Sequence, residues 1–147
     1  MTYFPSFVGL MHPVNVSGDV VRVGKAWHLV PESERGQKWA PGGIGLIDRD
    51  EQGRLYLLMH PGAADGTQGN GGSEVWVFNP KTQQRVQRIS LREWGLSLGV
   101  SRGHNPLLMI VNPINMTLEV YKADSGEFIR TISDFGQETP LLIRGSH

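Results

Sequence analysis

Histidine and carboxylate side chains are the groups of this 147-residue sequence best suited to bind a metal ion or transfer protons. Imidazole nitrogens and carboxylate oxygens are ligands of zinc, manganese and iron, and the bound metal activates water at neutral pH. We predict metal ligands at His28, His60 and Glu138, and catalytic groups at His60 and Glu93. No His-x-His or His-Glu-x-x-His spacing reinforces this set. The chemistry such a divalent transition-metal site supports is hydrolysis of an ester or phosphoester.

Two other segments resemble functional motifs but lack a required residue. The run 48–53 begins like a calcium loop, yet its twelfth position is Met59 instead of glutamate. We interpret it as a turn between strands. The glycine-rich run 66–72 lacks the Lys-Ser/Thr of a phosphate-binding loop, and we interpret it as a flexible loop or lid.

Composition excludes several classes of protein. Fourteen basic and fourteen acidic residues balance, which argues against nucleic-acid or membrane-surface binding. The absence of cysteine excludes a disulfide scaffold, a Cys-ligated metal site and a thiol nucleophile. No apolar run approaches the roughly 20 residues of a membrane span.

The elements that must position the candidate residues are short strands. Nineteen glycines and nine prolines in a chain that is 39% hydrophobic indicate many turns between strands. The best helix candidate, 31–36, is one or two turns long. We predict strands near residues 2–5, 10–16, 20–23, 43–48, 54–59, 74–78, 85–89, 96–100, 107–111, 117–121, 127–132 and 139–143.

An internal repeat organises these strands into a β-propeller. The segment 75–89 aligns with 118–132 at an offset of 43 residues, and 11–21 is a weaker copy. Four short strands in roughly 40–50 residues are typical of a propeller blade. We therefore predict an all-β chain of about three blades.

The predicted blades form one domain, 1–143, whose ends are complementary. Blade one (2–23) lacks its inner strand, blade two (43–89) and blade three (96–132) are complete, and 139–143 is a spare inner strand. Residues 144–147 resemble the start of a purification tag. Three blades are too few for a ring, which has roughly four to eight. We predict a homodimer that completes a six-bladed propeller by exchanging its terminal strands.

This arrangement gathers the candidate ligands at one end of the propeller. Loops between the second and third strands, and between successive blades, emerge on the same face. His60 begins such a loop, while His28, Glu93 and Glu138 lie in inter-blade loops. His12 falls within a strand and His104 on the opposite face.

Four stretches resemble the C-terminal part of the heavy chain of the quinoprotein amine dehydrogenases, which act on methylamine or aromatic amines. They are Thr2-Tyr3-Phe4-Pro5-Ser6-Phe7-Val8-Gly9, Trp39-Ala40-Pro41-Gly42-Gly43, Arg54-Leu55-Tyr56-Leu57-Leu58-Met59-His60-Pro61 and Val75-Trp76-Val77-Phe78-Asn79-Pro80-Lys81-Thr82. The resemblance covers nearly all of 2–143. It implies less than half of a seven-bladed propeller whose tryptophan-derived quinone sits in a separate, cysteine-rich light chain.

The resemblance implies a heavy-chain-like module for assembly or ligand binding, without a quinone of its own. A small homodimeric metal-dependent hydrolase is the alternative, and an accessory piece of an amine-oxidising complex is a third. Besides a second copy, a small molecule is an expected ligand. Family members are periplasmic, but the N-terminus shows no export signal, so as it stands the sequence predicts a cytoplasmic location.

Overall fold

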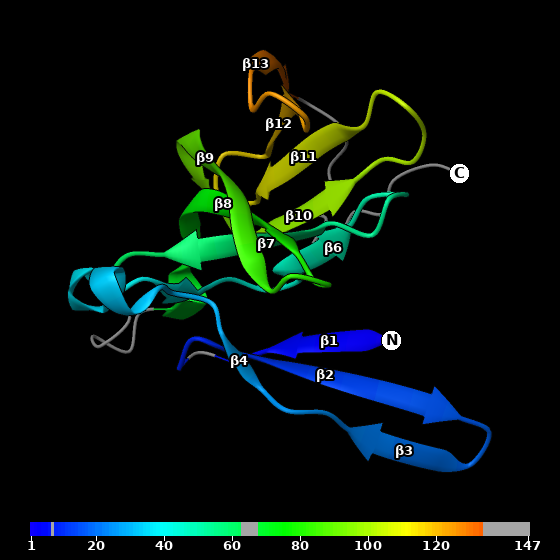
Figure 1. Cartoon of the computed structure of the whole chain (residues 1–147). Coiled ribbons are helices and arrows are strands. Elements are labelled where there is room, and N and C mark those ends of the chain that lie inside the picture. The colour runs from blue at the N-terminus through cyan, green and yellow to red at the C-terminus, as the bar shows by residue number, and fades with distance from the viewer. Residues whose placement is uncertain (7, 63–67, 134–147) are drawn as a thin grey trace.

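Three antiparallel sheets follow one another along the chain (Figure 1). The computed structural model describes residues 1–6, 8–62 and 68–133. Their helices are short 3-10 turns, η1 (Glu32–Gln37) and η3 (Gln68–Asn70), and none is long and apolar enough to cross a membrane. The helix candidate at 31–36 is therefore observed as η1.

The first sheet has three strand positions. Its strands are β1 (Thr2–Pro5), β2 (Leu10–Ser17), β3 (Val20–Val23) and β4 (Trp27–His28). The order is β1-β2-β3, and β4 pairs with the start of β2 beyond the end of β3. The prediction that His28 lies in an inter-blade loop is wrong, because its backbone pairs with Leu10 in this sheet.

The second sheet has four strand positions. Its strands are β5 (Ala40–Pro41), β6 (Ile47–Arg49), β7 (Leu55–His60), β8 (Gly72–Asn79) and β9 (Gln84–Gly95). Both β5 and β6 pair with β7, so together they form the inner strand, followed by β7, β8 and β9.

The third sheet repeats this order. Its strands are β10 (Ser97–Val100), β11 (Leu107–Asn112), β12 (Thr117–Lys122) and β13 (Phe128–Ser133), paired in sequence. The prediction of an all-β chain built from propeller blades is confirmed as a partial propeller. The predicted strand 139–143 and the tag-like residues 144–147 lie outside the described residues.

Side-chain alternation on β7 explains how neighbouring blades pack. Leu55, Leu57 and Met59 join Met11 and Trp27 in an apolar core between the first and second sheets. Tyr56 and Leu58 face the other way, into a core shared with the third sheet. A strand buried on both faces must be apolar throughout, which is why β7 shows no polar alternation.

A glycine allows the end of β9 to approach the third sheet closely. An ideal Cβ on Gly95 would overlap with Cγ2 of Ile110. The pairing changes from Glu74–Ser90 to Gly72–Gly95, so residues 91–94 bulge opposite the single residue Ser73. The prediction that Glu93 lies in an inter-blade loop is therefore wrong, because it belongs to β9.

Candidate functional site

His60 is a buried residue of the second sheet. It is the last residue of β7 and only 3% exposed. Its Nδ1 lies 2.8 Å from the carbonyl oxygen of Gly71, and its ring packs edge-on against Trp94 at 5.4 Å between centroids. These contacts fix the orientation of the ring on the second sheet.

His28 lies on the other side of the second sheet. It is exposed and lines a groove of about 420 Å³ with Val30, Arg35, Phe78, Gln83 and Arg85. Phe78 belongs to the core shared with the first sheet, whereas His60 shares the strand face of Tyr56 and Leu58. The sheet therefore separates the two histidines that we predicted to act together. We call this groove, at the junction of blades one and two, the junction groove.

Glu93, the one predicted carboxylate among the described residues, does not complete a metal centre there. Glu93 is exposed on β9, where one oxygen accepts a hydrogen bond from Nδ2 of Asn115 at 3.4 Å. Glu138 lies outside the described residues. Within residues 1–6, 8–62 and 68–133, no three His, Asp or Glu side chains form a group that could hold a metal ion. The hydrolase hypothesis stays a prediction without supporting geometry.

The segment that resembled a calcium loop is a turn fixed by an internal ion pair. The Asp50 carboxylate accepts bonds from the backbone N–H of Arg54 at 3.0 Å, from its Nε at 2.7 Å and from the Tyr56 hydroxyl at 3.1 Å. Burial, together with the charge on Asp50, raises the pKa of Tyr56 well above its usual range. The Asp50 carboxylate is therefore already hydrogen-bonded to groups of the same chain.

The glycine-rich run 66–72 is described only in part. Residues 68–70 form η3 and Gly72 begins β8, while 66–67 lie outside the described residues.

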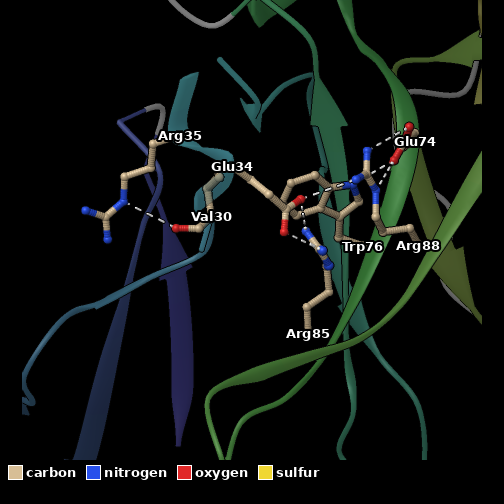
Figure 2. A network of polar contacts seen from close by, with 7 residues as sticks. All are labelled: Val30, Glu34, Arg35, Glu74, Trp76, Arg85 and Arg88. Atoms are coloured by element: carbon tan, nitrogen blue, oxygen red, sulfur yellow. Dashed lines mark hydrogen bonds and ion pairs between the residues drawn. The ribbon is translucent and has the colours of Figure 1, made fainter. Parts of the chain in front are cut away.

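A network of arginines, carboxylates and tryptophans connects η1 to the second sheet (Figure 2). Glu34 receives two bonds from Arg85, at 3.1 and 2.8 Å, and one from Arg88 at 3.3 Å. Arg88 also binds both oxygens of Glu74, at 2.8 and 3.2 Å, and Trp76 donates to Glu74 at 2.9 Å. We call these five residues the junction clamp.

Aromatic rings support the charges of the junction clamp. The guanidinium carbons of Arg85 and Arg88 lie 4.5 and 4.9 Å from the centre of the Trp76 ring. Trp39, just before β5, packs on Trp76 at 5.6 Å between centroids. Guanidinium groups stack favourably on aromatic faces, so the rings and charges together fix the position of η1.

The clamp is electrically balanced and suited to holding elements together. Hydrogen bonds from Arg85 lower the pKa of Glu34, against the opposing effect of burial, so its carboxylate stays ionised at neutral pH. Two arginines then face two glutamates, which leaves no group of the clamp free to transfer a proton. The arrangement therefore supports a structural role at the junction of blades one and two.

Sequence reasoning missed the clamp because a β-bulge conceals it. Residues three apart on a regular strand point to opposite faces. The register shifts between Val77 and Phe78, so that Arg85 pairs with Phe78 while Arg88 pairs with Trp76. This shift puts both arginines on the face of Trp76. The alternation of Glu74, Trp76 and Phe78 was the sequence pattern that could have indicated part of the clamp, because these residues share one face of β8.

The sequence model of the methylamine dehydrogenase heavy chain matches residues 2–145. The chain belongs to this family. The methylamine dehydrogenase heavy chain of Paracoccus versutus is 27% identical over 141 residues, covering 95% of this chain and 33% of that protein. The heavy chain of Methylorubrum extorquens is 23% identical over 134 residues, covering 90% and 32%. This family member therefore spans about a third of the length of these curated relatives.

A solved structure supports the fold of this heavy-chain family member. Hydrazine synthase of Kuenenia stuttgartiensis superposes with a TM-score of 0.52 at 16% identity, over 71% of this chain and 26% of that one. At this identity the likeness concerns the fold alone.

The motifs that resemble the heavy-chain family serve the blade framework in this structure. In the Trp-x-Pro-Gly-Gly stretch, Trp39 packs on Trp76, while Gly43 has a φ of +115° and an ideal Cβ on it would lie 2.6 Å from the carbonyl oxygen of Leu96. In the Lys-Thr turn, the Asn79 side chain accepts the backbone N–H of Lys81 at 2.9 Å. The heavy-chain resemblance therefore rests on residues that shape blades.

Proposed function

We propose that this chain is an assembly module of the amine dehydrogenase heavy-chain type, which binds a second copy of itself and carries no quinone. The observation that supports this most strongly is the outer face of blade one. Val16, Val21 and Val23 are 59%, 62% and 68% exposed, and Phe4 is 54% exposed.

The register places these four side chains on one surface. Val16 pairs with Val21 and Val14 with Val23, and residues two apart on β2 share a face. Phe4 pairs with His12 on that same face, whereas Met11 points to the opposite side, into the core with blade two. Contiguous exposed apolar surface of this kind marks an interaction site. We call these residues the valine face.

The inner edge of blade one supports the same proposal. β10 and the β5–β6 pair form the inner strands of the other two sheets, but in the first sheet the order begins with β1. A hollow of about 210 Å³ beside β1 is lined by Tyr3, Ile47 and Leu55. An unpaired strand edge is a ready template for another strand.

A second copy satisfies both features. Both faces of blade two are covered by neighbouring sheets, so packing of another blade on the valine face continues the existing pattern. Two copies supply six blades, within the roughly four to eight of closed propellers. Residues 139–143, with their Leu-Leu-Ile run, are the proposed strand for the partner's β1 edge. Zero formal net charge leaves little long-range repulsion between copies.

Mass measurement by light scattering tests this assembly. The expected mass of the parent is twice the 16.3 kDa of one chain. Val23→Glu places a charge in the proposed interface and should give monomers, while Val86→Glu makes the same change at a 52% exposed valine on β9 and should remain dimeric. A monomeric parent at all concentrations, or a dimer unaffected by Val23→Glu, would overturn the proposal.

Strand exchange is tested separately from face packing. Proline cannot donate a ladder hydrogen bond, so Leu141→Pro should weaken the dimer if 139–143 adds to β1. A dimer that Val23→Glu dissociates and Leu141→Pro leaves intact would support face packing and reject strand exchange.

A further inference from the structure

The junction groove contains an arginine that the fold has not paired with a carboxylate. Its walls come from the segment after β4 and from the turn leading into β9, and His28, Arg35 and Gln83 stand along it. Its volume of about 420 Å³ falls within the range of small-molecule sites, roughly 300–1,000 Å³.

Arg35 differs from the two arginines of the junction clamp. Figure 2 shows Glu34 and Arg35 pointing to opposite sides of η1, so Arg35 lies away from the clamp. Its Nε donates to the carbonyl oxygen of Val30 at 3.4 Å, which orients the guanidinium. Among the described residues, no carboxylate lies within 4 Å of it, whereas Arg85 and Arg88 both have one. The two terminal nitrogens of Arg35 therefore remain available as donors.

The other groups along the groove suit a ligand with one charged end. Gln83 and Gln84 are exposed amides at the opposite wall, and His28 is an exposed imidazole. Leu29, Val30 and Phe78 form a closely packed apolar base. Guanidinium binds carboxylate with two parallel hydrogen bonds, while the hydrocarbon stems of the exposed side chains along the groove contact a short apolar body.

We propose that the junction groove binds a small monocarboxylate with a short aliphatic or aromatic body. The carboxylate pairs with the terminal nitrogens of Arg35, and the body lies along the base between η1 and the start of β9. Glu34 lies on the far side of η1 and is already bound by Arg85 and Arg88, so the pairing leaves the clamp intact. This site is independent of the proposed assembly, which uses the valine face.

Calorimetric titration of the full chain with hexanoate tests the proposal, with hexylamine as the probe of opposite charge. Arg35→Gln should weaken hexanoate binding about tenfold or more, since it removes a charge-assisted pair. Arg130→Gln is the matched control, because Arg130 is an exposed arginine on β13. It should leave the affinity unchanged.

Three results would overturn the proposal. One is the absence of saturable hexanoate binding at about 10 mM, where a millimolar site would be filled. Another is equal binding of hexylamine, which would show that the charge of the ligand does not matter. The third is an equal effect of Arg35→Gln and Arg130→Gln. Thermal melts of both variants verify that each is folded before titration.

Discussion

Arg85→Ala is the substitution that most directly tests the junction clamp. It removes two hydrogen bonds to Glu34, at 3.1 and 2.8 Å, and a guanidinium 4.5 Å from the centre of the Trp76 ring. The Arg85 and Glu34 side chains are 19% and 20% exposed, so water screens their interaction only in part. Glu34 keeps one bond from Arg88 after the change.

The expected cost follows from these contacts. Hydrogen bonds to charged groups contribute about 1.5–3 kcal/mol, and partial exposure places this pair near the lower end. The contact with Trp76 adds about 0.5–1 kcal/mol. Arg85→Ala should therefore lower the free energy of unfolding by about 2–3 kcal/mol.

Denaturant unfolding followed by tryptophan fluorescence measures this loss, with all variants at one protein concentration because oligomers couple stability to concentration. A double-mutant cycle with Glu34→Gln should give a coupling energy of about 1 kcal/mol or more. Lys122→Ala is the control, because the Lys122–Glu127 pair is 58% and 65% exposed and should contribute under about 0.5 kcal/mol. A loss below about 0.5 kcal/mol for Arg85→Ala, or no coupling with Glu34, would refute the clamp.

Two further outcomes concern Glu34 and His60. Because the pKa of Glu34 is lowered in the folded chain, its contribution is complete above the unfolded value, about 4.3, and is lost as pH falls through the folded pKa. Glu34→Gln should therefore destabilise the chain more at pH 7 than at pH 3 in unfolding curves, and an equal loss at both would contradict this. His60→Ala breaks the contacts with Gly71 and Trp94 and should cost about 1–3 kcal/mol without changing the metal content of the purified protein. A fall in bound metal would instead favour the hydrolase hypothesis.

Strand positions were predictable because burial leaves a strong pattern in the sequence. β7 is apolar at five consecutive positions, 55–59, and its two faces fill two different cores. The 43-residue offset between 75–89 and 118–132 corresponds to β8–β9 and β12–β13, which occupy the same places in successive sheets. Repeated packing environments select repeated side chains, so sheet order could be inferred without coordinates.

The candidate site was harder to predict because it depends on how strands end. The sequence alone placed His28 and Glu93 in inter-blade loops, whereas β4 extends the first sheet to His28 and β9 continues to Gly95. A bulge interrupts the two-residue alternation of a strand, and in β9 residues 91–94 bulge opposite Ser73, so the pattern there does not read as a strand. Residue types alone indicated that His28 and His60 could bind a metal, but only the alternation of β7 shows that a sheet separates them.

The 3-10 helix η1 carries both Glu34, a residue of the junction clamp, and Arg35, the residue proposed to bind a carboxylate. Adjacent residues, Glu34 and Arg35, leave it on opposite sides, and only Glu34 is held by partners on the second sheet. The clamp therefore holds the backbone that carries Arg35, and the Arg35 Nε donates one bond, at 3.4 Å, to the Val30 carbonyl. A guanidinium on a backbone that is already held loses less freedom when it binds an anion, which favours binding. Arg35 is thus an exposed guanidinium on a backbone that the clamp holds in place, which is the arrangement that the proposed carboxylate site requires.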